Sequence, residues 1–263
     1  MKYKTKMLAD RLVSVLSQWP GVECVSLNEA ALPDTLDPYF ALILDVFYTG
    51  VIPEAEERNR LLGEDIAAFE SAGQAIGQAG KDRFLVGEIP VRIEYKSSVR
   101  VEELVSFADS RQESLWLIKD SGTYGFYRLA HGDILFSRTG WIDAIRARLR
   151  KPNDAFWARM REAAQSKMEH FLGDLGAALA HGDDFYYLIS SSGFIKFACF
   201  TLFCLNRRFE PSHRAYYDQV IALPKLPASF PAELENFLMD GGEMTLERRY
   251  ALAQIIAKGI VAL

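Results

Sequence analysis

Apolar and polar positions alternate at helical spacing in the first part of the chain. Between residues 4 and 19 the apolar side chains recur every three or four residues, and Pro20-Gly21 follows. This pattern predicts an amphipathic helix that stops at the Pro-Gly pair. The runs VECVSL (22–27) and YFALILDVFY (39–48) are short and rich in strand-forming residues, so we expect two strands there.

The next segment predicts further helices and strands. Residues 54–72, rich in Glu, Arg, Leu and Ala, favour a helix, and the runs RFLV (83–86) and IPVRIEY (89–95) favour two strands joined by Gly87-Glu88. In the second of these strands apolar residues alternate with charged ones, so one face of that strand is polar. The charged positions are Arg92, Glu94 and Lys96. A helix at about 100–110 and short segments near 116–118 and 125–136 complete this half.

From Thr139 onward every long segment has helical spacing. Breaks occur at GDD (182–184), EPS (210–212), LPKLP (223–227) and DGGEM (240–244), and the acidic residues before the apolar run at 185 suggest a helix N-cap rather than a metal site. The order of elements therefore predicts an α+β protein. An α+β domain at 1–138 precedes an all-helical bundle domain at 139–263.

Composition narrows the class of protein. Of 263 residues, 49% are hydrophobic and 25% are charged, as in folded, water-soluble proteins. The formal net charge of −5 argues against an extended nucleic-acid surface, although a local basic pocket is compatible with it. Three cysteines without zinc spacing predict reduced thiols in a cytoplasmic protein. The segment 186–206 is long and apolar enough to span a bilayer, but the central Lys196 favours a buried helix over a membrane-spanning one.

The strand at 39–48 contains one charge, Asp45. Period-two alternation places Asp45 on the face opposite Leu44 and Val46, and a buried carboxylate must be paired, protonated or bound to a cation. Glu94, on the other mixed strand, could lie beside it. Two interpretations follow: the acids hold a hard divalent cation such as Mg²⁺, or Asp45 forms a structural salt bridge with Arg92 or Lys96 while Glu94 faces water.

A second group of basic residues lies in the helical half. The run NRRFEPSHR (206–214) places Arg207, Arg208 and His213 next to Tyr216 and Tyr217. Guanidinium groups suit phosphate oxygens and aromatic rings suit a base. The alternative is that the arginines neutralise the end of the preceding helix and the tyrosines pack in the bundle.

Several of these runs together resemble a known family. FALILDVFYTG, KDRFLVGEIPVRIEYK and LFCLNRRFEPSHR are similar to nucleotidyltransferase-like proteins of the polymerase-beta-type superfamily. The helical half resembles that of aminoglycoside nucleotidyltransferases. The resemblance implies a mixed sheet with flanking helices, a Gly-Ser turn that holds a triphosphate, and three carboxylates that bind two Mg²⁺ ions. Asp45 matches the second acid and Glu94 the third, which gives them catalytic and metal-binding roles.

The chain departs from that family at two places. Ile43 stands where the first acid is expected, and a side chain without oxygen cannot ligate Mg²⁺. Asn28 and Glu29 stand near the expected Gly-Ser turn, where a glutamate would repel a triphosphate. Asp34 or Asp37 could replace a missing ligand.

The function that this resemblance implies is transfer of a nucleoside monophosphate from a nucleoside triphosphate to a hydroxyl of a small molecule or protein, with a weakened metal site. The substrate-binding residues expected from this reading are Asn28, Arg92, Lys96 and Arg208. The alternative is a catalytically inactive nucleotide-binding or protein-interaction module on the same fold.

Overall fold

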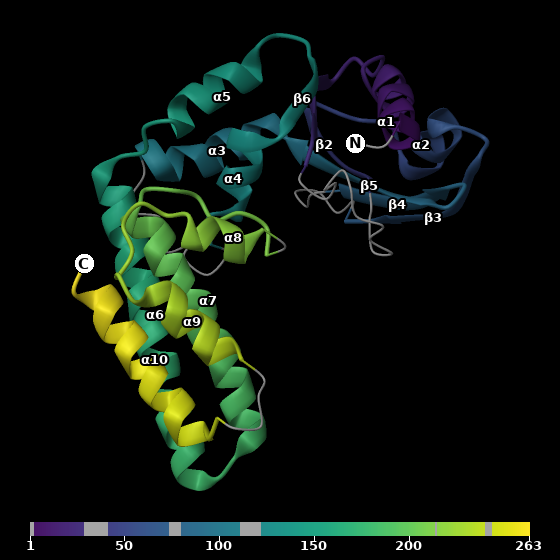
Figure 1. Cartoon of the computed structure of the whole chain (residues 1–263). Helices are drawn as coiled ribbons and strands as arrows, with labels where there is room; N and C mark the ends of the chain where they lie inside the picture. The colour runs from purple at the N-terminus through teal and green to yellow at the C-terminus, as the bar shows by residue number, and fades with distance from the viewer. Residues whose placement is uncertain (1–2, 29–41, 74–79, 111–121, 214, 240–243) are drawn as a thin grey trace. The chain divides into compact units, whose positions relative to one another are not determined.

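The computed structural model describes residues 3–28, 42–73, 80–110, 122–213, 215–239 and 244–263. The chain forms two compact units (Figure 1). The first consists of residues 1–109 and 126–151, and the second of residues 110–125 and 152–263. This division differs from the boundary predicted near residue 138, because the helix at 141–149 belongs to the first unit. Its Trp141 ring lies 5.5 Å from the ring of Phe47, which belongs to the central strand at 42–48.

The first unit is built on a six-stranded mixed sheet, and with the helical second unit it confirms the predicted α+β class. The strand order is β3-β4-β5-β2-β1-β6, in which β2 and β5 run parallel and the other pairs run antiparallel. The strands are β1 Val22–Leu27, β2 Leu42–Tyr48, β3 Ile66–Ala72, β4 Gly80–Val86, β5 Ile89–Ser97 and β6 Asp133–Ser137. The helices are α1 Tyr3–Leu16, α2 Ala55–Leu62, α3 Ser98–Asp109, α4 Tyr124–His131, whose first two residues are assigned to the second unit, and α5 Trp141–Leu149.

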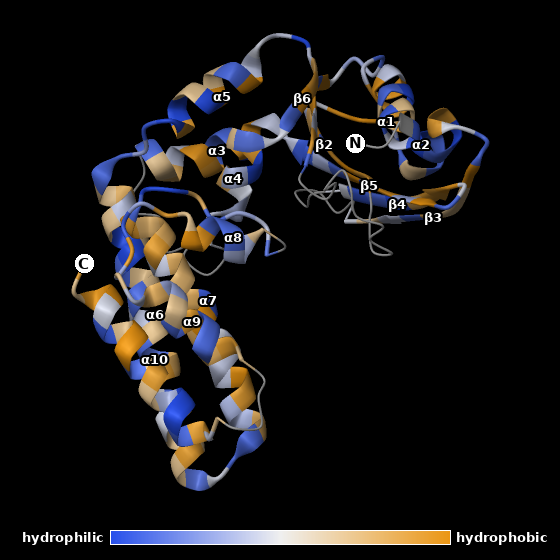
Figure 2. Cartoon of the chain, viewed as in Figure 1, coloured by the Kyte–Doolittle hydropathy of each residue, from blue (hydrophilic) through white to orange (hydrophobic). Residues whose placement is uncertain are grey.

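One face of this sheet forms the core of the first unit. The alternation predicted for β2 is confirmed: Leu42, Leu44 and Val46 are buried against the apolar positions of α1 and α2. Figure 2 shows hydrophobic colour along the central strands and on α1. The opposite face carries Asp45 and the charged positions of β5.

The helix predicted over residues 54–72 is wrong in its second half. Helix α2 ends at Leu62, Gly63 has φ 135°, and residues 66–72 form β3. Glycine adopts that dihedral without the steric cost that other residues meet. The edge strand β3 then pairs antiparallel with β4, with Ile66 opposite Val86. Pairing to a neighbouring strand therefore outweighs the helical propensity of the sequence IAAFESA.

A buried ion pair lies on the core side of the sheet. The Arg58 guanidinium, from α2, donates to both carboxylate oxygens of Asp82 on β4, at 2.7 and 2.8 Å. It also donates to Pro53 O at 2.8 Å and to the Ser71 hydroxyl at 2.8 Å, and Tyr95 donates to Asp82 at 2.8 Å. Nearly every polar atom of the pair thus has a partner, as burial of two charges requires.

The second unit is helical, as predicted. Its helices are α6 Asp154–His181, α7 Asp184–Leu205, α8 Tyr216–Ile221, α9 Phe230–Leu238 and α10 Leu246–Val261 (Figure 1). Gly182, with φ 65°, ends α6, and the Asp183 side chain accepts a hydrogen bond from Tyr186 N at the start of α7. The predicted N-cap is therefore confirmed.

Helix α7 is long and apolar enough to cross a membrane by length and composition. However, 56% of its most hydrophobic window is buried inside the unit, as in the core helix of a soluble protein. Its thiols are buried too, and burial raises the pKa of Cys199 to about 12.

Candidate functional site

The two predicted acids lie on one face of the sheet. In the parallel ladder between β2 and β5, Asp45 is the register partner of Glu94. Directly opposite residues on neighbouring strands point to the same side, so the two carboxylates meet. The sequence prediction that Glu94 lies beside Asp45 agrees with this geometry.

Asp45 is fully buried and surrounded by nitrogen donors. Its Oδ2 accepts from Asn28 Nδ2 at 2.6 Å and from Arg128 Nε at 3.1 Å. Its Oδ1 contacts Lys96 Nζ at 2.8 Å and accepts a short hydrogen bond from Arg128 Nη2. Both carboxylate oxygens of Asp45 therefore have partners. The positive charges of Lys96 and Arg128 balance its negative charge, because a buried carboxylate without a counter-charge would destabilise the fold.

Arg128, on α4, joins the two acids. While Nε and Nη2 bind Asp45, Nη1 lies 2.8 Å from Glu94 Oε2. The planar fork of a guanidinium suits such a bridge between two carboxylates. Sequence reasoning missed Arg128, and no motif marks it, because its partner Asp45 is 83 residues away along the chain.

Glu94 is surrounded by four cations. Besides Arg128, its oxygens lie 3.1 Å from Arg92 Nε, 3.5 Å from Lys96 Nζ and 4.0 Å from Lys81 Nζ. Burial by itself would raise the pKa of Glu94, but the charges of Arg128, Lys96, Arg92 and Lys81 outweigh burial and hold the pKa below its ordinary value of 4.5. Glu94 is therefore ionised at neutral pH.

Glu94→Gln is expected to lower the free energy of unfolding at neutral pH, and the difference should shrink as the pH falls. A carboxyl whose pKa is depressed in the folded state stabilises the fold above its unfolded pKa, here the ordinary value of 4.5, and loses this contribution as the pH falls through the folded pKa. Urea unfolding across the acidic range measures the difference.

The matched control is Glu88→Gln, which changes an exposed glutamate in the turn between β4 and β5. This variant is expected to differ from the unchanged protein by less than about 0.5 kcal/mol at every pH. A Glu94→Gln difference that stays constant from neutral to acidic pH would contradict the linkage.

We call Asn28, Asp45, Arg92, Glu94, Lys96 and Arg128 the polar cluster. Of the predicted substrate-binding residues, Asn28, Arg92 and Lys96 belong to it. Arg208 is an exposed residue of the helical unit, beyond the end of α7, and is not a member of the polar cluster. Glu29, Asp34 and Asp37 lie outside the described residues.

The predicted structural salt bridge of Asp45 agrees with the geometry in part. The ion pair between Asp45 and Lys96 is present. Glu94, however, does not simply face water, because its side chain is only 13% exposed and is held by cations.

The polar cluster does not fit the predicted Mg²⁺ ions in this arrangement. Mg²⁺ needs oxygen ligands, whereas the oxygens of Asp45 and Glu94 already contact an ammonium and a guanidinium. Ile43 supplies no oxygen, and no group of three or more metal-ligating side chains is found among the described residues. Metal binding by Asp45 and Glu94 stays a prediction, one that requires Arg128 and Lys96 to move.

Basic side chains continue along the sheet from the polar cluster. Arg83 on β4 lies directly opposite Arg92 on β5, and Lys81 lies opposite Glu94. Like charges at opposite positions repel each other. Arg92 Nε is buried and makes no hydrogen bond among the described residues, although it lies 3.1 Å from Glu94 Oε1. The basic side chains in this part of the sheet could therefore bind an anion. The nearest negative charge on β3 is Glu70, which lies opposite Arg83.

Comparison with solved structures relates the chain to a nucleotidyltransferase-like protein from Exiguobacterium sibiricum 255-15. The two align with a TM-score of 0.51 and 12% sequence identity, over 98% of this chain and 74% of that one. No protein-family model and no curated protein sequence matches the chain. Similarity at this identity concerns the fold alone, so the chain has a nucleotidyltransferase-like fold.

Proposed function

We propose that the polar cluster and the neighbouring basic strip bind a nucleotide through its phosphates, and that they do so with side-chain cations in place of Mg²⁺. This is the non-catalytic reading of the nucleotidyltransferase-like fold. The observation that carries it is the position of Arg128, whose guanidinium lies between the two remaining acids of the expected metal site.

The surplus of positive charge supports an anionic ligand. Among the described residues of the polar cluster and of the strip beside it, five side chains are basic and three are acidic, and two of the acids, Asp45 and Glu94, already form ion pairs. They are Lys81, Arg83, Arg92, Lys96 and Arg128, with Asp45, Glu70 and Glu94. A phosphate between Arg83 and Arg92 would offset their mutual repulsion and give Arg92 Nε, which contacts Glu94 but makes no hydrogen bond among the described residues, an acceptor.

Nucleotidyl transfer to a hydroxyl is the second candidate, favoured by the adjacency of Asp45 and Glu94. In that reaction the acids would have to exchange Arg128 and Lys96 for metal ions. The two candidates therefore differ in whether binding depends on Mg²⁺.

Nucleoside triphosphates are expected to raise the melting temperature equally with Mg²⁺ and with a chelator, because side-chain cations contact the phosphates directly. Arg83→Gln and Arg92→Gln should each weaken binding, measured by calorimetry in the chelator, about tenfold, as expected when one charged hydrogen bond is lost. Arg60→Gln is the control, since Arg60 is exposed on α2 and pairs loosely with Glu57.

Two results would contradict the proposal. Stabilisation only in the presence of Mg²⁺ would favour the transferase. Absence of binding by any nucleoside triphosphate, in a protein whose Arg60→Gln and unchanged forms are both folded, would exclude the nucleotide site.

A further inference from the structure

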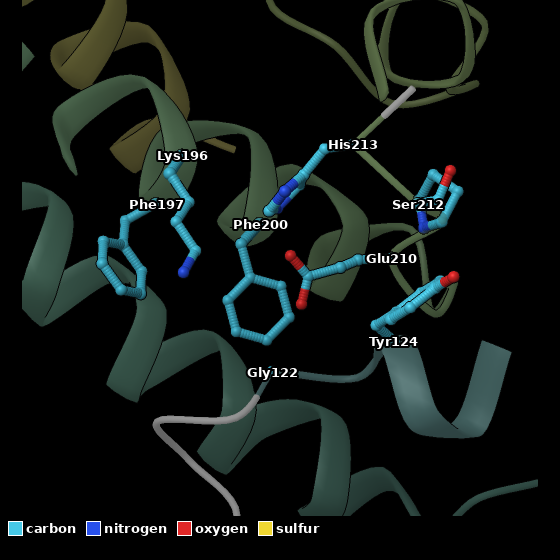
Figure 3. A pocket seen from close by; sticks show the side chains of 9 residues that line it. Gly122, Tyr124, Lys196, Phe197, Phe200, Glu210, Ser212 and His213 are labelled. Carbon is cyan, nitrogen blue, oxygen red and sulfur yellow. The ribbon is translucent and has the colours of Figure 1, made fainter. Parts of the chain in front are cut away.

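The helical unit contains a cavity of about 210 Å³ beside α7 and the turn that follows it (Figure 3). Its walls are largely aromatic, from Tyr124, Phe197 and Phe200. Charged groups from Lys196 and Glu210 also line it. The ammonium of Lys196 points into this cavity (Figure 3).

Glu210 is held in one orientation. Its side chain is buried, its Oε2 accepts from Thr123 N at 3.0 Å, and its Oε1 accepts from the Tyr216 hydroxyl at 2.8 Å. Thr123 in turn accepts from Glu210 N at 2.8 Å. Gly122, with φ 67°, approaches so closely that a Cβ there would lie 2.2 Å from Oε2. The carboxylate of Glu210 is thus held in place, and it faces the cavity (Figure 3).

The charge of Glu210 has no cation beside it. Within the described part of the chain no Lys, Arg or His nitrogen lies within 4.0 Å of its oxygens, and its only direct partners are neutral donors. Burial raises the pKa of Tyr216, and the nearby Glu210 raises it further, so Tyr216 keeps its proton and donates. A carboxylate has about four acceptor positions, so room remains for a cation from a ligand.

Lys196 adds a second condition on the ligand, besides the cationic group that would pair with Glu210. Its ammonium lies 5.3 Å from the centre of the Phe197 ring, and its positive charge disfavours a ligand that is only a cation. A ligand with a cationic and an anionic end would match both residues. The small volume limits the ligand to about the size of an amino acid, because pockets that hold drug-sized ligands measure roughly 300–1,000 Å³.

We propose that this cavity binds a free α-amino acid with an apolar side chain. The ligand ammonium pairs with Glu210, its carboxylate contacts Lys196, and its side chain packs on Phe200 and Tyr124. This inference is independent of the nucleotide proposal, since every residue it uses belongs to the helical unit.

The experiment is titration calorimetry of the full chain with leucine and phenylalanine, each beside two analogues. One analogue lacks the carboxylate (isoamylamine, phenethylamine) and the other lacks the amine (4-methylpentanoate, 3-phenylpropionate). At least one amino acid should bind and should bind about tenfold or more tightly than both of its analogues, since each lost charged hydrogen bond has roughly that effect.

Variants assign the two ends of the ligand. Lys196→Met should weaken amino-acid binding about tenfold and leave the amine analogue unaffected or tighter. Glu210→Gln should abolish the advantage of the amino acid over its amine-free analogue. The matched control is Lys167→Met, because Lys167 Nζ lies 5.1 Å from the same Phe197 ring but does not line the cavity.

The proposal is overturned if neither amino acid binds the unchanged protein, or if the analogues bind as tightly as the amino acids. It is also overturned if Lys196→Met and Lys167→Met have equal effects. Lys196 is exposed, so its variant is expected to fold even if Glu210→Gln does not.

Discussion

Arg58→Met is expected to lower the free energy of unfolding of the first unit by about 3–5 kcal/mol, the usual effect of removing one partner from a buried ion pair. Arg58 is 1% exposed and Asp82 is fully buried. Without the guanidinium, Asp82 keeps a hydrogen bond from Tyr95 but has no counter-charge from any other residue that the structure describes. Hydrogen exchange of β4 and β5 peptides in increasing urea measures this unit separately from the helical one.

The double variant Arg58→Met/Asp82→Leu is the control. Replacing both charges with apolar groups removes the unpaired carboxylate, so most of the lost stability should return. A loss below about 1 kcal/mol in the single variant, the range of a surface pair, would contradict the structural role of the ion pair.

Gly122→Ala is expected to destabilise the helical unit by about 3 kcal/mol, from left-handed backbone strain and the displacement of a buried, hydrogen-bonded carboxylate. The new methyl group would lie 2.2 Å from Glu210 Oε2. Glu210 cannot retreat without losing its hydrogen bonds to Thr123 N and Tyr216. Hydrogen exchange of α7 peptides in urea measures the effect.

Gly182→Ala is the matched control in the same unit. Gly182 has φ 65°, close to the 67° of Gly122, but no atom lies within 4 Å of a Cβ built there. Gly182→Ala should therefore lower the free energy of unfolding by only about 1 kcal/mol, the contribution of the left-handed backbone conformation. Equal losses in the two variants would show that contact with Glu210 adds nothing.

The polar cluster supplies Asp45 and Glu94 with counter-charges from the chain itself. Lys96 and Arg128 contact the carboxylate oxygens of both residues. Buried acids in such a site are stabilised by cations of the chain itself. The proposed phosphate site then uses the basic residues that remain, chiefly Arg83 and Arg92.

Much of the architecture followed from the sequence. Alternation along β2 placed Asp45 on the face opposite Leu44, and alternation along β5 placed Glu94 on one face with Arg92 and Lys96. The helical second half and the Asp183 cap were also predicted. These features depend on side-chain period and on hydrogen bonds between residues close in sequence, so the sequence by itself determines them.

Other features were decided only by tertiary structure. Residues 66–72 became the strand β3 because β4 offered a free edge, against the local preference for a helix. Arg128 entered the polar cluster across 83 residues, and Thr123 met Glu210 across 87. The periodicity of the sequence carries no information on such contacts. The packing of the elements in space decides which side chains, distant in sequence, lie beside a buried charge.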